Sequence, residues 1–292
     1  MEEEIRSLWM PRYKVIIKEG IYHIIQRAPG REIIFCEDSD YLYFFHLLKK
    51  LYEEFGLNLL CFSLLPNHFH LLIKLKEPNL TQLMRKLLTS YAMYFNTKYQ
   101  RKGHVFYGRY RASFCNDEKY LITLSLYIHL NPFNAKLCKF PQDYKWCSLP
   151  FYTKEKKSSF VRSNYILSLL SSDIKKAKEI YRDLLKEASK IKAKDVIEDK
   201  RAPFKFALEI VKFLSSLKLS CKNRAMLEDI EEKIAFLKSK RLLKKPQDKE
   251  ALVYLIQQLE SRGFTKREIG EMVRMSPTTL YRVQNAIKKD SP

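Results

Sequence analysis

Two consecutive apolar segments, residues 57–65 and 68–75, constrain the fold of this chain most strongly. Each is long enough for a β-strand, and only Pro66 and Asn67 separate them. Pro and Asn are favoured in tight turns, so the pattern predicts a β-hairpin. We therefore expect an antiparallel sheet in the first half of the chain.

The other segments of this half alternate between strand and helix patterns. We expect a strand at residues 21–26, helices at 38–55 and 79–100, and a short extended segment at 105–115 that Gly108 interrupts. A further helix, capped by Asn116 or Asp117, is expected to run to Asn131, where Pro132 ends it. This order predicts an α+β domain, an antiparallel sheet with packed helices.

The charge of the chain indicates its partner. Among 292 residues there are 54 Lys and Arg against 33 Asp and Glu, a formal net charge of +21. Such an excess favours a nucleic acid over the alternative of a ribosomal or other acidic surface. The sequence has no apolar run of about 20 residues and no secretory signal pattern, so we expect a cytoplasmic protein without a membrane anchor. Its six cysteines form no CxxC pair and are expected to be reduced.

Composition changes after the run KEKKSS at residues 154–159, from aromatic-rich to Leu-, Lys- and Glu-rich. We therefore predict three parts. Residues 1–152 form the α+β domain, residues 153–245 form a helical linker or scaffold, and residues 246–292 form a second DNA-binding region, so that the C-terminal part is all-α.

His68-Phe69-His70 is the first motif that can carry chemistry. Side chains two apart on a strand point to the same face, so both imidazoles project together. Two such imidazoles are suited to a divalent metal, although a pair of hydrogen-bonded sheet residues would show the same pattern.

The second motif is Tyr127-Ile128-His129-Leu130-Asn131. On a helix Tyr127 and Asn131 are four residues apart and lie on one face, where a phenol can act as a nucleophile and an amide oxygen can complete a metal site. His129 falls off that face, and we expect it at the surface or behind the ligands.

Together these motifs resemble the HUH single-tyrosine transposases, particularly the REP-associated tyrosine transposase branch. The resemblance runs over about residues 10–152 and rests on PNHFHLL at 66–72 and on YIHLNP at 127–132, with matches at Tyr22-His23, Arg27, Arg31-Glu32, Phe106, Gly108-Arg109-Tyr110, Asp117, Tyr120, Ala135, Tyr144, Trp146 and Ser148. It implies a ferredoxin-like HUH catalytic domain.

The resemblance also implies roles for single residues. His68, His70 and Asn131 would bind Mg²⁺ or Mn²⁺, and Tyr127 would attack single-stranded or hairpin DNA to leave a 5′-phosphotyrosine and a free 3′-hydroxyl. Tyr120, two helical turns before Tyr127, is a rival nucleophile that lacks an Asn four residues later. Members of the family act as monomers or as homodimers, and both states stay open.

Contacts with DNA are expected in two places. Arg109 and Arg111 flank Tyr110, a basic and aromatic mixture that suits single strands. Near the C-terminus, Thr265 and Glu268 form a capping box and Ser276-Pro277 can open the next helix, which predicts a helix-turn-helix. Arg282 and Lys288 of its second helix would contact duplex DNA.

The sequence therefore predicts a metal-dependent enzyme that cleaves and rejoins single-stranded DNA. The alternative is a non-catalytic, sequence-specific DNA-binding regulator that retains the fold.

Overall fold

The predicted hairpin lies at the centre of the N-terminal half. In the computed structural model, which describes residues 16–115, 118–156, 160–191 and 264–289 and single residues within 193–210 and 252–260, strands β2 (Asn58–Leu65) and β3 (His68–Lys74) pair in antiparallel fashion. Their register places Leu65 opposite His68, so the Pro66-Asn67 turn joins them directly.

Two further strands complete a four-stranded sheet in the order β2-β3-β1-β4. β1 (Ile21–Arg27) pairs antiparallel with β3 on one side and with β4 (Arg111–Phe114) on the other. With α2 between β1 and β2 and α3 between β3 and β4, the succession is the β-α-β-β-α-β of a ferredoxin-like domain. The predicted α+β class is confirmed.

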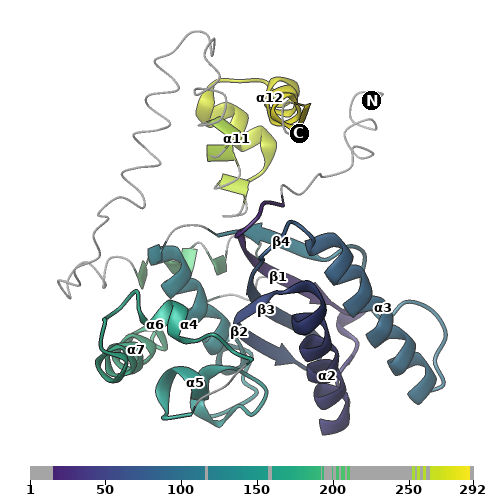
Figure 1. Ribbon diagram of the computed structural model, residues 1–292, viewed down its shortest axis with the longest axis vertical. Helices are drawn as coiled ribbons and strands as arrows, with labels where there is room; N and C mark the ends of the chain where they lie inside the picture. Colours follow the sequence, from purple (N-terminus) through teal and green to yellow (C-terminus); the bar gives the residue numbers. More distant parts are fainter. Residues whose placement is uncertain are drawn as a thin grey trace.

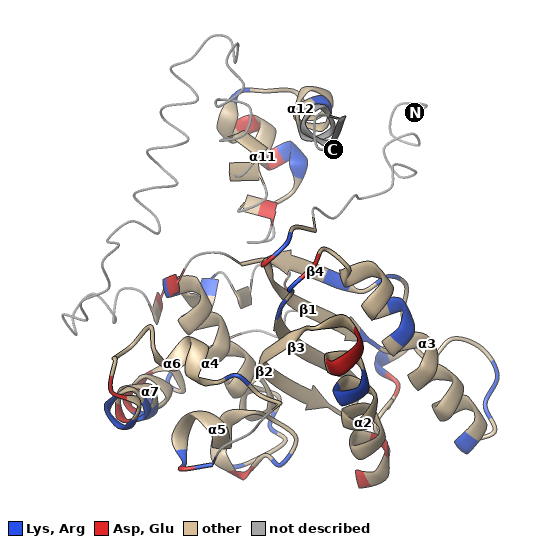
Figure 2. Ribbon diagram, in the orientation of Figure 1, with Lys and Arg blue, Asp and Glu red and all other residues tan. Residues whose placement is uncertain are grey.

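Helices α2 (Asp38–Phe55) and α3 (Leu80–Lys98) cover one face of the sheet (Figure 1). Phe44 of α2 and Leu83 of α3 pack in one hydrophobic cluster with Phe69 of β3. The bounds of α2 match the prediction because Glu37 and Asp40 form a capping box and Gly56 adopts a left-handed φ of 64° at the end. α3 carries Lys and Arg but no acidic residue, as Figure 2 shows.

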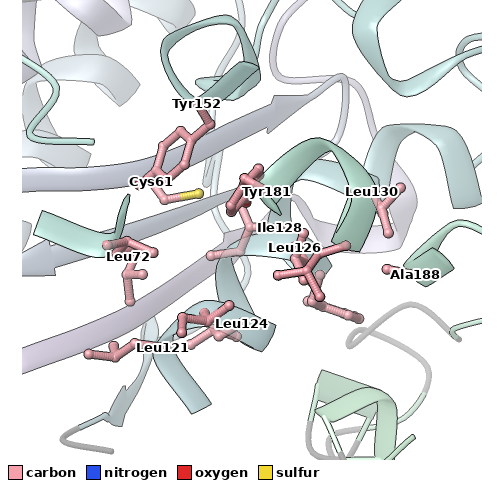
Figure 3. Packing of buried hydrophobic residues seen from close by; sticks show 14 of the residues in the cluster. Cys61, Leu72, Leu121, Leu124, Leu126, Ile128, Leu130, Tyr152, Tyr181 and Ala188 are labelled. Atoms are coloured by element: carbon pink, nitrogen blue, oxygen red, sulfur yellow. The ribbon is translucent and has the colours of Figure 1, made fainter. Parts of the chain in front are cut away.

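The opposite face is covered by α4 (Glu118–Asn134), α5 (Leu149–Thr153), α6 (Asn164–Leu167) and α7 (Ile174–Ala188), and the short 3-10 helices at Pro29–Arg31 and Pro141–Asp143 lie in connecting loops. Leu72, Leu124 and Tyr181 share a cluster that continues to Ile210. Figure 3 shows part of it, with the Tyr152 ring over Cys61 and Tyr181 close by. The cluster thus includes residues on both sides of position 152, where we predict a boundary.

Two predicted elements differ from the observed ones. Pro132 lies inside α4 rather than beyond its end. Proline removes only its own amide bond, and the turn continues because the Ala135 amide donates to the Asn131 carbonyl at 2.9 Å. The extended segment at 105–115 contains a strand only from Arg111, because Gly108 has a φ of 58° and interrupts it.

The described C-terminal residues are helical, as predicted. α11 (Lys266–Val273) begins at the predicted capping box of Thr265 and Glu268, and α12 (Pro277–Lys289) begins after Ser276, whose Oγ accepts from the Thr279 amide at 3.1 Å. Most of the helical region expected at 190–245, much of that at 248–262 and the Asn116/Asp117 cap lie outside the described residues.

Five cysteines of the described part of the chain are free thiols, as expected: Cys36, Cys61, Cys115, Cys138 and Cys147. Over the same part, no helix has the combination of length and hydropathy needed to cross a membrane.

Candidate active site

The two histidines of the HxH motif lie on the face of the sheet that α4 covers. His68 and His70 are 2% and 0% exposed, and their ring centroids are 5.1 Å apart. Phe69 between them points into the opposite cluster, under α2 and α3. The strand alternation predicted from sequence therefore brings both imidazoles to one buried face.

A third histidine, which sequence reasoning did not single out as a site residue, joins them. His23 of β1 is 2% exposed, and its Nε2 lies 3.0 Å from Nδ1 of His70, with the two rings stacked at 5.3 Å. The sequence signal was weak, because a lone histidine in a strand is informative only once the β1–β3 register is known. That register places His23 opposite Leu72, diagonal to His70.

These imidazoles are neutral, as metal ligands must be. Burial lowers the pKa of His23 to about 3, and the nearby Arg111 charge lowers it further. The pKa of His70 lies well below its ordinary value because of burial first, and then because of His68, His23 and Arg111. Both rings therefore keep a lone pair at physiological pH.

The helix α4 supplies the tyrosine. Tyr127 is 0% exposed, and its ring meets that of His70 edge-on, with centroids 6.1 Å apart and an interplanar angle of 81°. On its other side lies Phe206, at 5.6 Å. Asn131 follows one helical turn later and is 3% exposed. The rival Tyr120 is also buried, at 1%. The structure thus brings Tyr127 together with the HxH pair.

The donor set fits a hard divalent cation held in part by solvent and substrate. Nε2 of His70 is buried and has no hydrogen-bond partner among the described residues, which leaves its lone pair available. Within the described residues no group of three His, Cys, Asp or Glu side chains is arranged to hold a metal. A site here would therefore combine two imidazoles with the amide oxygen of Asn131 and with water or phosphate oxygens.

His129 does not lie at the surface, so that part of the expectation is wrong. It is 0% exposed, and its ring nitrogens contact the Tyr181 hydroxyl at 2.8 Å and the Ser148 hydroxyl at 2.7 Å. The reason is that α4 is buried on every side, from Tyr120 to Pro132. A helix that is apolar all round is buried all round, a signal already present in the sequence.

Basic and aromatic side chains lie near the HxH strand. Arg109 is exposed, and Arg111 is partly buried in β4 opposite Ile25. Sequence reasoning missed Tyr107, which is 58% exposed and has the Arg27 guanidinium 4.6 Å from its ring centre. Arg27 is paired with His68 in the sheet, so this aromatic platform is adjacent to the HxH pair.

The C-terminal helices form a short helix pair. α11 and α12 share a small core that contains Ile269, Val273 and Leu280. The turn between them requires Gly270, because a Cβ there would lie 2.5 Å from the Met275 carbonyl oxygen. Arg282 is exposed on α12, whereas Lys288 lies on the same helix with its side chain outside the described residues.

Comparison with known proteins is limited to the first half of the chain. Residues 16–131 match the family model described as "Transposase IS200 like". A REP-associated tyrosine transposase solved with a REP hairpin is similar in structure, at 16% identity and a TM-score of 0.43, over 52% of this chain and 98% of its own. A transposase-like protein from Deinococcus radiodurans is similar at 16% identity and a TM-score of 0.30, over 38% and 91%. A search of curated proteins found no match.

The matched segment begins before β1 and ends at Asn131, so it contains all four strands, the HxH pair and Tyr127. Its description agrees with the family that the two motifs indicate. Through residues 16–131, this chain belongs to the IS200-like transposases, which are HUH single-tyrosine transposases.

Proposed function

We propose that the chain is a metal-dependent enzyme that cleaves and rejoins single-stranded DNA through a 5′-phosphotyrosine. The observation that carries this proposal is the contact between the Tyr127 ring and the buried ring of His70, 6.1 Å apart, on the face of the sheet that presents the HxH pair. A nucleophile beside two neutral imidazoles and an amide is the arrangement that such a transfer needs.

The cation would be Mg²⁺ or Mn²⁺, held by His68, His70 and Asn131, and it would polarise the scissile phosphate. In the reaction, the Tyr127 Oη forms a bond to phosphorus, the bond to the 3′ oxygen breaks, and the phenolic proton leaves to solvent while the 3′ oxygen gains one. The diester is kept in the enzyme–DNA link. A second 3′-hydroxyl can therefore reverse the step without ATP.

Burial of Tyr127 sets a condition on this chemistry. A ring that is 0% exposed cannot touch DNA, so the segment that carries Phe206 must move away from it before attack. The same burial is what a non-catalytic DNA-binding regulator would tolerate indefinitely. It is therefore the observation that keeps the regulator as the second candidate.

We infer that the substrate strand lies along β4 and the loop before it. Exposed Tyr107 can stack on an unpaired base, and Arg27, Arg109 and Arg111 can neutralise phosphates on either side of it. The helix pair α11–α12 would add duplex binding through Arg282 and Lys288 of α12. Hairpin DNA, which offers a single strand beside a duplex, suits both surfaces.

A cleavage assay on labelled hairpin oligonucleotides separates the two candidates. The full chain and Tyr127→Phe are incubated with Mg²⁺, Mn²⁺ or EDTA, and products are resolved on a denaturing gel, with binding followed separately on a native gel. The enzyme predicts a metal-dependent protein–DNA adduct that Tyr127→Phe abolishes while hairpin binding persists. Tight binding without any adduct would overturn the enzyme in favour of the regulator. Tyr120→Phe, another buried tyrosine of α4, is the matched control and should retain the adduct.

A further inference from the structure

His23 reaches the metal-ligand face from the neighbouring strand. It is buried at 2%, and it contacts His70 through a single pair of atoms, Nε2 of His23 and Nδ1 of His70, at 3.0 Å. This distance is that of an ordinary hydrogen bond between ring nitrogens. The stacked rings, 17° from parallel, show that the contact fixes the plane of the His70 ring as well.

A hydrogen bond between two neutral imidazoles has one donor and one acceptor, so it fixes where both protons lie. If His23 donates, the proton of His70 must lie on its Nε2, which then cannot bind a cation. If His70 donates from Nδ1, its Nε2 carries a lone pair. Only the second arrangement is compatible with His70 as a ligand.

The surroundings favour the second arrangement even before a cation binds. Nε2 of His70 is buried and has no partner among the described residues. A proton placed there would be a buried N–H without an acceptor, which costs about 1–3 kcal/mol. Placed on Nδ1, the same proton is donated to His23.

We propose that His23 is a positioning residue that accepts the Nδ1 proton of His70 and so presents Nε2 of His70 to a divalent cation. The inference rests on the proposed function, because it assigns a role at the same site. It adds a partner behind the ligand, of the kind that orients metal-bound histidines and whose loss typically weakens metal binding 10–100-fold.

Two measurements on the full-length protein test it. The first is ¹⁵N NMR of the histidine rings in metal-free protein, which reports the tautomer of His70 directly. We expect the proton on Nδ1 in the wild type and a loss of that preference in His23→Leu. A wild-type His70 protonated on Nε2 would overturn the proposal, whatever the protein does with DNA.

The second measurement is Mn²⁺ binding by electron paramagnetic resonance without DNA. His23→Leu should bind Mn²⁺ about 10–100-fold more weakly than the wild type. His23→Gln, whose side-chain carbonyl can accept the Nδ1 proton, should recover most of the affinity and also controls for folding. His104→Leu, which removes an exposed histidine, should leave Mn²⁺ binding unchanged.

The outcomes separate this inference from the proposed function. Equal Mn²⁺ affinity in His23→Leu and His104→Leu would refute the role of His23 and leave the enzyme intact. Wild-type protein that binds no Mn²⁺ would overturn the proposed metal site, and the role of His23 toward a cation with it. The NMR measurement would still establish which nitrogen of His70 carries the proton.

Discussion

Removal of the Tyr181 hydroxyl tests how firmly α7 is attached to the helix that carries Tyr127. The hydroxyl lies 2.8 Å from Nδ1 of His129 and 2.9 Å from Oγ of Ser125, both on α4. All three side chains are buried, and burial keeps the tyrosine and the histidine uncharged by raising the pKa of Tyr181 and lowering that of His129 to about 3. The contacts are therefore neutral hydrogen bonds in a site without water access.

The magnitude follows from what Tyr181→Phe leaves behind. Ser125 keeps its bond to the Ile122 carbonyl, at 2.7 Å, so its hydroxyl stays satisfied. Nδ1 of His129 loses its partner, and a buried polar atom in that state costs about 1–3 kcal/mol. The ring itself remains, so no cavity forms. We expect the free energy of unfolding to fall by about 2 kcal/mol, which corresponds to a Tm lower by about 4–8 °C.

The assay is urea denaturation of the full chain, followed by tryptophan fluorescence and by circular dichroism so that agreement between the probes can be checked. Tyr165→Phe is the matched control, because Tyr165 is 38% exposed and its loss of a hydroxyl should change stability by less than about 0.5 kcal/mol. If Tyr181→Phe is as stable as this control, the buried hydroxyl does not stabilise the α4–α7 contact and the reasoning fails.

Three other changes have definite expected outcomes. Asp40→Asn should lower the free energy of unfolding by about 1.5–3 kcal/mol, because the buried carboxylate accepts charge-assisted and backbone hydrogen bonds. Burial raises the pKa of Asp40 but these bonds outweigh it and the pKa is lowered, so acid titration should remove the advantage of the wild type as pH falls through the folded-state pKa. Gly270→Ala should unfold the α11–α12 pair and weaken duplex binding in a native gel, against the usual gain of about 1 kcal/mol for this change in a helix, since the Cβ meets the Met275 carbonyl; unchanged binding would contradict it. Phe206→Leu should expose Tyr127 and speed adduct formation on a denaturing gel, and a slower rate in a folded variant would show that Phe206 supports the site instead.

Much of the fold could be predicted from sequence because its signals are local. The turn at Pro66-Asn67 determines the hairpin register, and Gly56 ends α2 where a left-handed residue is needed. The site was predictable to the extent that it depends on spacing along one element. His68 and His70 share a strand face, and Tyr127 and Asn131 share a helix face.

The rest depends on contacts between elements that are distant in sequence. His23 meets His70 only through the register of β1 on β3, and no spacing in the sequence contains that information. His129 was misplaced because we considered one face of α4, whereas packing of α7 and the sheet buries every face. The cover of Phe206 over Tyr127 comes from a residue 79 positions away and could not be foreseen.

The most direct test of the account is to locate the covalent link. The protein–DNA adduct formed with a hairpin substrate and Mn²⁺ is digested with nuclease and protease, and the modified peptide is sequenced by mass spectrometry. The account predicts a nucleotide attached through its 5′ phosphate to Tyr127. A link at Tyr120 would contradict the site assignment, and an intact substrate under every metal condition would contradict the proposed activity itself.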